Sequence, residues 1–152
     1  MTAMTAKGFT LFELLVVLVL LALIAAVSAP FLSKGLGRAE VKGSAQNVAT
    51  ALRRARGEAV VRNTDVALTV DVNERSFKIA GAETLDLPAA LKVELFTAQT
   101  EQISDDVGNI RFFSDGSSTG GEIVLADGKS KFHVQVDWLT GRVSVIDAAA
   151  AQ

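Results

Sequence analysis

The chain has 152 residues, of which 49% are hydrophobic, and its formal net charge is −2 at pH 7. It contains no cysteine and one histidine. This composition excludes a disulfide framework and thiolate metal sites and leaves the common transition-metal sites without ligands, so no metal and no cofactor is expected.

The first predicted element is an apolar helix. The 21 residues from Phe9 to Ala29 contain one charged side chain, Glu13. A helix of that length spans roughly 31 Å, close to the thickness of the bilayer core, so we predict a transmembrane helix over residues 9–30. A carboxylate costs about 2.5–3.5 kcal/mol at the bilayer centre, and a plain anchor leaves it unexplained. A cleaved secretory signal ending in "AAVSAP" is an alternative, but the apolar run is long for one.

Residues 31–62 are predicted to form an amphipathic stem helix. Pro30, Gly35 and Gly37 weaken helix at the junction, where a kink or local melting is expected. Beyond it, apolar residues recur in alternating steps of four and three: Val41, Ala45, Val48, Leu52, Ala55 and Ala59. This spacing forms one helix face, and its many alanines allow close approach to a sheet. Polar residues 63–65 predict the end of the helix.

From residue 66 the apolar period changes to two, which is typical of strands. Residues 66–72 and 77–79 predict a β-hairpin, and residues 123–145 predict three antiparallel strands joined by turns at 127–128 and 140–141. Further strands are expected at 91–96 and 110–113, with a loop over 97–109. Phe112 and Trp138 are expected in the core, and His133 is expected to face solvent. The predicted fold is α+β, with the long N-terminal helix packed on an antiparallel β-sheet head of residues 63–152.

Two segments admit an enzymatic interpretation, which the pattern does not favour. The segment "DGSSTGG" (115–121) is a conceivable phosphate-binding loop, but it lacks the Gly-Lys-Ser/Thr ending of a P-loop, and an ordinary strand connection is preferred. His133, Asp137 and a nearby serine could make a triad on paper, although nothing fixes the geometry that a triad needs. We therefore assign no catalytic residue.

The N-terminal segment "KGFTLFELLVVLVLLALIAAVSAP" (7–30) resembles the N-termini of type IV pilins and of type II secretion pseudopilins. This resemblance implies that a prepilin peptidase removes residues 1–8 by cutting between Gly8 and Phe9, and that the new amine of Phe9 is methylated. Glu13 lies one helical turn after Phe9 and could pair with a positively charged amine of its own chain or of a neighbour. Glu13 and Pro30, which interrupts the apolar helix, are therefore the expected assembly residues.

The C-terminal half is most similar to the H-type minor pseudopilins, also described as GspH/FimT-like. The segments that carry this resemblance are "IRFFSDGSSTGGEIVL" (110–125) and "VQVDWLTGRVSV" (134–145), with Ser114 where relatives tend to have proline. It implies a non-enzymatic subunit at or near the tip of the periplasmic pseudopilus, which drives export of folded proteins across the outer membrane. The implied partners are other pseudopilins in a hetero-oligomeric tip, the prepilin peptidase, the inner-membrane assembly platform and membrane lipid.

The expected membrane topology and the distribution of charge along the chain are considered together. The resemblance implies a single-pass protein of the bacterial inner membrane with its C-terminal head in the periplasm, although Lys34, Arg38 and Lys42 would by the positive-inside rule favour the cytoplasm. Residues 34–62 carry +5 and residues 63–152 carry −7. This segregation could bring the basic stem of one copy near the acidic head of another, or mark two solvated faces.

Two other functions stay open. One is a minor type IV pilin, in pilus assembly or DNA uptake; the acidic head disfavours nucleic acid as a partner. The other is a non-polymerising, membrane-anchored periplasmic binding module, in which Glu13 would be dispensable.

Overall fold

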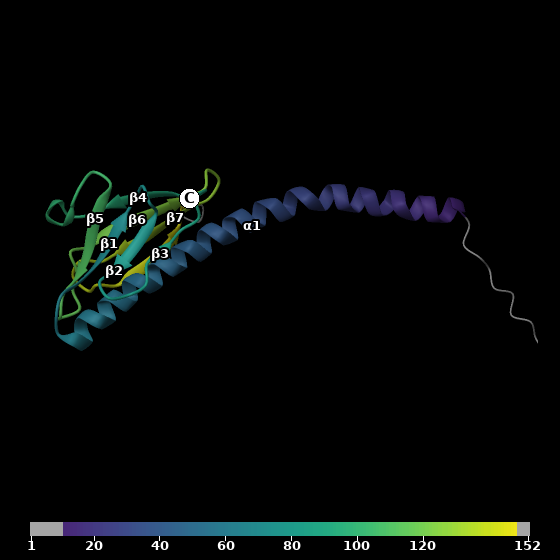
Figure 1. Cartoon of the computed structure of the whole chain (residues 1–152). Helices are drawn as coiled ribbons and strands as arrows, with labels where there is room; N and C mark the ends of the chain where they lie inside the picture. Colours follow the sequence, from purple (N-terminus) through teal and green to yellow (C-terminus); the bar gives the residue numbers. More distant parts are fainter. Residues whose placement is uncertain (1–10, 149–152) are drawn as a thin grey trace, which may run out of the picture. The chain divides into compact units, whose positions relative to one another are not determined.

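The computed structural model describes residues 11–148, and within the first helix the side chains of residues 24–36 are not described. The chain forms two compact units, Met1–Leu36 and Gly37–Gln152. The helix α1 (Leu11–Arg62) contributes residues to both units (Figure 1). Everything else that is described belongs to the second unit, which is the head.

In the first unit, α1 continues without a break through Pro30 and Gly35. Of the two outcomes predicted there, local melting is wrong, because every residue of Leu11–Arg62 is helical. The kink stays a prediction. No helix among the described residues has both the length and the hydropathy that a bilayer span requires. Phe9 and the side chains of residues 24–30, which belong to the predicted transmembrane segment, lie outside the described residues.

In the head, the predicted apolar face of the stem is confirmed. Val41, Ala45, Val48, Leu52, Ala55 and Ala59 are each at most 1% exposed. The helix ends after Arg62 with Asn63 at a φ of 50°, where the N–H of Thr64 donates to the carbonyl of Ala59 and that of Asn63 to Val60. These two bonds and the left-handed residue make the Schellman arrangement that satisfies the last carbonyls of a helix.

The strands form two antiparallel sheets. The first has the order β3-β2-β1-β5, and the second has the order β4-β6-β7-β8. The bounds of the first sheet are β1 (Val66–Asp71), β2 (Ser76–Ile79), β3 (Leu85–Asp86) and β5 (Val107–Phe112). Those of the second are β4 (Lys92–Phe96), β6 (Gly121–Ala126), β7 (Lys131–Val136) and β8 (Val143–Asp147). The predicted antiparallel head is confirmed, but its strands divide between two sheets.

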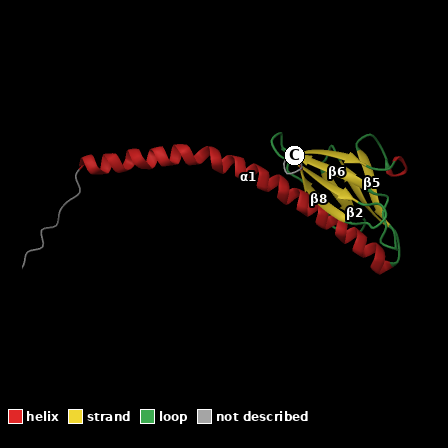
Figure 2. Cartoon of the chain, turned by 180° about the vertical axis from the view of Figure 1, so that it is seen from behind, coloured by secondary structure: helices red, strands yellow, loops and turns green. Residues whose placement is uncertain are grey.

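Both sheets lie beside the second half of α1 (Figure 2). The inward residues of the strands and the alanine-rich face of the helix share one core, in which Leu68 of β1 lies opposite Ile110 of β5 and both are fully buried. Alanines on the helix leave room for such branched side chains, because a smaller helix face lets the sheet approach more closely.

The predicted hairpin β1–β2 and the meander β6–β7–β8 are confirmed. The predicted loop at 97–109 holds a short 3₁₀ helix, η1 (Gln99–Glu101), and the first residues of β5. Phe112 is fully buried, as predicted, but the core placement of Trp138 is wrong, since this side chain is 66% exposed. The strand β7 ends at Val136, and a turn closed by the N–H of Gly141 on the carbonyl of Asp137 places Trp138 outside the alternation.

Candidate functional site

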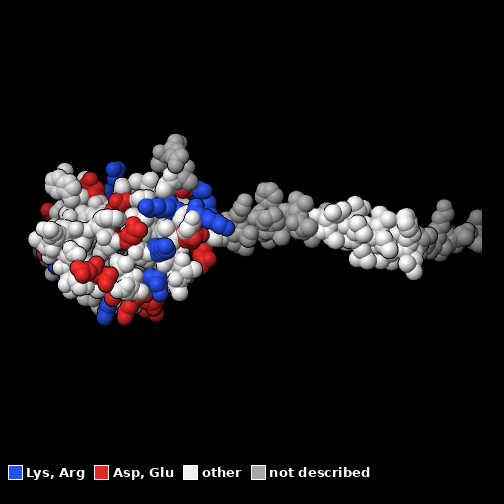
Figure 3. All heavy atoms as spheres, turned by 90° about the horizontal axis from the view of Figure 1, so that it is seen from above, with Lys and Arg blue, Asp and Glu red and all other residues white. Residues whose placement is uncertain are grey.

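The described start of α1 is an apolar helix segment with its side chains exposed. Its large hydrophobic residues from Leu11 to Leu23 are between 39% and 85% exposed. On the face seen in Figure 3 this segment shows no basic or acidic atoms in its described part. A helix that is apolar all round is stable when other helices or lipid cover it. The segment therefore presents an uncovered apolar surface over Leu11 to Leu23.

The predicted processing and assembly residues belong to this part of the chain. Gly8 and Phe9 lie outside the described residues. Glu13 lies in the first turn of α1, where the partial positive charge of a helix N-terminus favours a carboxylate. Pro30 lies inside α1, with its side chain outside the described part. The processing role of Gly8 and Phe9 and the assembly role of Glu13 and Pro30 stay predictions.

In the head, two arginines of the stem bind the loops that carry the H-type resemblance. The Nε of Arg56 donates to the carbonyl oxygen of Gly116 at 2.9 Å, and a terminal nitrogen of Arg53 donates to that of Val143 at 3.1 Å. Gly116 lies in the β5–β6 connection and Val143 begins β8. The two segments 110–125 and 134–145 therefore meet on the same part of α1.

The two loops also bind each other. The N–H of Ser118 donates to the carbonyl of Trp138 at 2.8 Å. The "DGSSTGG" segment is the connection between β5 of the first sheet and β6 of the second, which confirms the strand-connection interpretation. Gly141 has a φ of 61°, and a Cβ there would lie 2.2 Å from the carbonyl oxygen of Gly116. Only glycine allows this close approach of the two backbones.

Each loop is held by an aspartate that accepts hydrogen bonds from its own turn. Asp115 accepts from the hydroxyl of Ser117 at 2.6 Å and from its N–H at 2.8 Å. Asp137 accepts from the hydroxyl of Thr140 at 2.7 Å and from its N–H at 2.8 Å. These donors stabilise the carboxylate form, so the hydroxyls first and the N–H groups second lower the pKa of both aspartates. Each turn is thus fixed by hydrogen bonds within its own loop.

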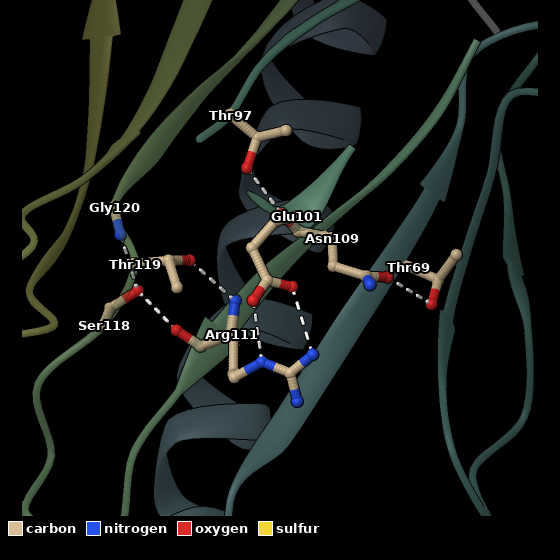
Figure 4. A network of polar contacts seen from close by, with 8 residues as sticks. All are labelled: Thr69, Thr97, Glu101, Asn109, Arg111, Ser118, Thr119 and Gly120. Atoms are coloured by element: carbon tan, nitrogen blue, oxygen red, sulfur yellow. Dashed lines mark hydrogen bonds and ion pairs between the residues drawn. The ribbon is translucent and has the colours of Figure 1, made fainter. Parts of the chain in front are cut away.

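A polar network connects η1 to β5 on the outside of the first sheet (Figure 4). Arg111 donates to both carboxylate oxygens of Glu101, at 2.8 and 3.2 Å, and Glu101 is 8% exposed. This hydrogen bond raises the pKa of Arg111. Asn109, two residues before Arg111 on β5, accepts two further hydrogen bonds. The hydroxyl of Thr69 donates to its side-chain oxygen at 2.8 Å, and the hydroxyl of Thr97 donates to its backbone carbonyl at 2.6 Å. Sequence reasoning missed this network, because Glu101 falls in the predicted loop.

His133 is only partly exposed, with 25% of its side chain accessible. Its Nδ1 contacts a carboxylate oxygen of Glu122 on the neighbouring strand β6. The His133 side chain therefore reaches solvent only in part, whereas the sequence predicted a solvent-facing position. The hydrogen-bonding partner of its ring is Glu122 and not Asp137. Asp137 instead accepts hydrogen bonds from the hydroxyl and the N–H of Thr140. This arrangement does not build the triad considered from the sequence.

Two family models match the chain. The model described as type II transport protein GspH matches residues 44–141, and the prokaryotic N-terminal methylation motif matches residues 4–29. The type II secretion system protein H of Xanthomonas campestris pv. campestris is 35% identical over 137 residues, which cover 90% of this chain and 81% of that protein.

Solved structures share the fold. The minor pseudopilin EpsH from the type 2 secretion system of Vibrio cholerae aligns with a TM-score of 0.57 at 15% identity, covering 71% of this chain and 97% of EpsH. The type IV minor pilin FimU of Pseudomonas aeruginosa aligns with a TM-score of 0.55 at 17% identity, covering 72% of this chain and 90% of FimU. At these identities the likeness concerns the fold.

Proposed function

Because this chain belongs to the GspH family of type II transport proteins, we propose that it acts at or near the tip of the periplasmic pseudopilus that drives export of folded proteins across the outer membrane. It is a minor pseudopilin of the type II secretion system. The observation that carries this function is the 35% identity to a type II secretion system protein H over 90% of the chain. The family is structural, and we propose no enzymatic activity and no cofactor.

We infer that the chain is processed before it assembles. A prepilin peptidase cuts between Gly8 and Phe9, removes the leader of residues 1–8, and the new amine of Phe9 is methylated. The match of the N-terminal methylation motif to residues 4–29 supports this proposal. The mature chain then has the order of residues 9–30 as membrane and assembly helix, 31–62 as stem and 63–152 as head.

The apolar start of α1 serves as both anchor and assembly helix. The exposed hydrophobic side chains from Leu11 to Leu23 are covered by membrane lipid before assembly and by the helices of other pseudopilins afterwards. Glu13 pairs with a methylated amine of its own chain or a neighbour, which offsets the cost of a carboxylate in lipid. Pro30 marks the end of the membrane part and is a proposed assembly residue. The inner-membrane assembly platform is a further proposed partner.

The methylation motif and the protein H relative fit a membrane-anchored protein with a periplasmic head. The finer proposal is a single pass through the bacterial inner membrane, with the C-terminal head outside the cytoplasm. Residues 63–152, which form the strand part of the head, carry −7, so nucleic acid is not a proposed partner.

The intact mass of the chain extracted from membranes tests the processing. We expect the mass of residues 9–152 plus one methyl group. A retained leader, or cleavage after Ala29, would contradict the proposal. Gly8→Ala is a suitable variant to block the cut, and its product should keep residues 1–8.

FimU shows that minor type IV pilins share this fold, so a direct test of the secretion role should include pilus functions. A deletion strain separates the two systems. We expect loss of protein secretion with normal twitching motility and normal DNA uptake, and restoration of secretion by the intact gene. The opposite pattern, with secretion unchanged and twitching lost, would favour the pilus.

A further inference from the structure

A hollow of about 530 Å³ lies between α1 and the turn from β7 to β8. Its lining residues are Arg53, Arg56, Thr140, Gly141, Arg142 and Val143. Three arginine residues therefore line one depression, and no acidic residue in the described part of the chain contributes to its lining. We call this the arginine hollow.

The three guanidinium groups retain free donors. An arginine has five N–H donors, and Arg53 and Arg56 each use one on a backbone carbonyl. Arg142 donates no side-chain hydrogen bond to any described residue, and none of the three is in an ion pair within residues 11–148. By contrast, Arg54 and Arg62 on the same helix both pair with Glu58. The hollow thus gathers three arginine residues that form no ion pair within residues 11–148. Arg142 also lines a neighbouring depression with Glu122 and Asp137.

The carboxylate of Asp137 forms no ion pair with Arg142. Arg142 helps to lower the pKa of Asp137, after the hydrogen bonds from Thr140. The same oxygen of Asp137 already accepts from the N–H and the hydroxyl of Thr140, which hold it in the turn. The turn therefore fixes the rim of the arginine hollow, and a carboxylate from outside can reach donors that are already in place.

An exposed aromatic side chain adjoins the arginine hollow. Arg142 also lines a second depression, together with Trp138, which is 66% exposed. Leu139, the next residue, is 64% exposed. Tryptophan and arginine are the residue types that most often carry binding energy at protein interfaces. Guanidinium groups pair with planar carboxylates through two parallel bonds.

We propose that the arginine hollow binds carboxylate side chains of an acidic segment on the head of a neighbouring pseudopilin of another kind, with Trp138 making the apolar contact. This inference rests on the proposed function, because the partner is a subunit of the same filament. A minor subunit has mostly subunits of other kinds beside it. The charge of the hollow selects an acidic surface among them, and fixed guanidinium groups set the orientation of the contact.

Site-specific photo-crosslinking tests the contact in cells that make the whole secretion system. A benzoylphenylalanine at Leu139 of the full chain places the probe beside the arginine hollow. We expect a crosslink to another pseudopilin, in a peptide that contains Asp or Glu close to the attachment point. Arg142→Glu should lower its yield about fivefold or more, while Arg142→Lys should lower it less.

Arg54→Glu is the matched control, since it makes the same charge change on α1 at a residue paired with Glu58. Its crosslink yield should stay near that of the unmodified chain. Arg142 has no side-chain hydrogen bond to lose among the described residues, so Arg142→Glu should keep its cellular level and its melting temperature. If it unfolds, Arg142→Gln replaces it, with the same expected fall in yield.

Four results would overturn the proposal: no crosslink, a crosslink to lipid or to a second copy of this chain, attachment in a segment without acidic residues, or a yield that Arg142→Glu leaves unchanged. Failure of the proposed function looks different, because a deletion strain would then secrete normally. If the deletion strain fails to secrete but Arg142→Glu leaves the crosslink yield unchanged, the proposed function stands and only the binding role of the arginine hollow is rejected.

Discussion

Arg56 of the stem donates from Nε to the carbonyl oxygen of Gly116 at 2.9 Å, across 60 residues of sequence. This bond joins α1 to the loop that crosses from the first sheet to the second. Gly141 approaches the same carbonyl from the β7–β8 turn. The contact therefore holds three separate segments at one point.

Gly141→Ala should destabilise the head by about 1–3 kcal/mol. Its φ of 61° is unfavourable for alanine, and the added Cβ would lie 2.2 Å from the oxygen of Gly116. Urea unfolding of the purified chain measures the change. Gly57→Ala is the control, because nothing lies within 4 Å of its added Cβ and helix propensity favours alanine by about 1 kcal/mol. An equal response of both variants would contradict the strained approach.

Leu52→Ala should lower the free energy of unfolding by about 2–5 kcal/mol. Leu52 is fully buried on the alanine-rich face of α1, where neighbouring atoms cannot close the space that it leaves. Val61→Ala, on the same helix but 86% exposed, should change stability by less than about 0.5 kcal/mol. Thermal unfolding measures the melting temperatures of both variants. Similar melting temperatures would contradict the packing of the stem helix on the two sheets.

Glu101→Gln should destabilise the head by about 1–3 kcal/mol, because it removes the charge that pairs with Arg111 and leaves Arg111 with fewer strong acceptors. The exposure of Arg111 limits the effect, since solvent screens its charge. Glu58→Gln, which breaks the exposed pairs with Arg54 and Arg62, should cost at most about 1 kcal/mol. A double-mutant cycle of Glu101→Gln with Arg111→Met measures the coupling, and a coupling near zero would reject this pair as a stabilising contact.

The carboxyl group of Asp137 should titrate below the ordinary aspartate value of about 3.9. The hydroxyl and the N–H of Thr140 favour its charged form and lower its pKa. With the folded pKa below the unfolded one, the stabilising effect is present above the unfolded pKa and is lost as the pH falls through the folded pKa. NMR titration of the side-chain carbon of Asp137 reports the midpoint. Thr140→Ala should raise it and Thr140→Ser should not; no difference between the two would contradict this cause.

Glu13→Ala should reduce co-purification with other pseudopilins by tenfold or more, because breaking a buried ion pair costs about 3–5 kcal/mol. Leu14→Ala, a change on the same exposed part of α1, is the control and should keep most of the assembly. Quantitative mass spectrometry of the membrane-extracted complexes measures the ratio. Unchanged assembly of the Glu13→Ala chain would favour a non-polymerising anchored module instead.

The local patterns of the sequence predicted much of the fold. Alternating steps of three and four identified the buried face of α1, and period-two alternation identified β1, β2, β6, β7 and β8. These patterns suffice because a helix or a strand repeats its buried positions at a fixed interval, whatever it packs against. The placement of Gly8, Phe9 and Glu13 at the start of an apolar run likewise indicated the pilin and pseudopilin group, because that motif is contiguous in the chain. The H-type resemblance came from segments 110–125 and 134–145.

Tertiary structure alone decided how β3, β4 and β5 pair, and so divided the head into two sheets. It also decided that Trp138 leaves the alternation for an exposed turn, that Glu101 pairs with Arg111, and that Arg53, Arg56 and Arg142 line one hollow. These relationships join residues far apart in the chain. A local period records which side of an element is buried, but the choice of partner depends on loop paths and on the packing of the whole core.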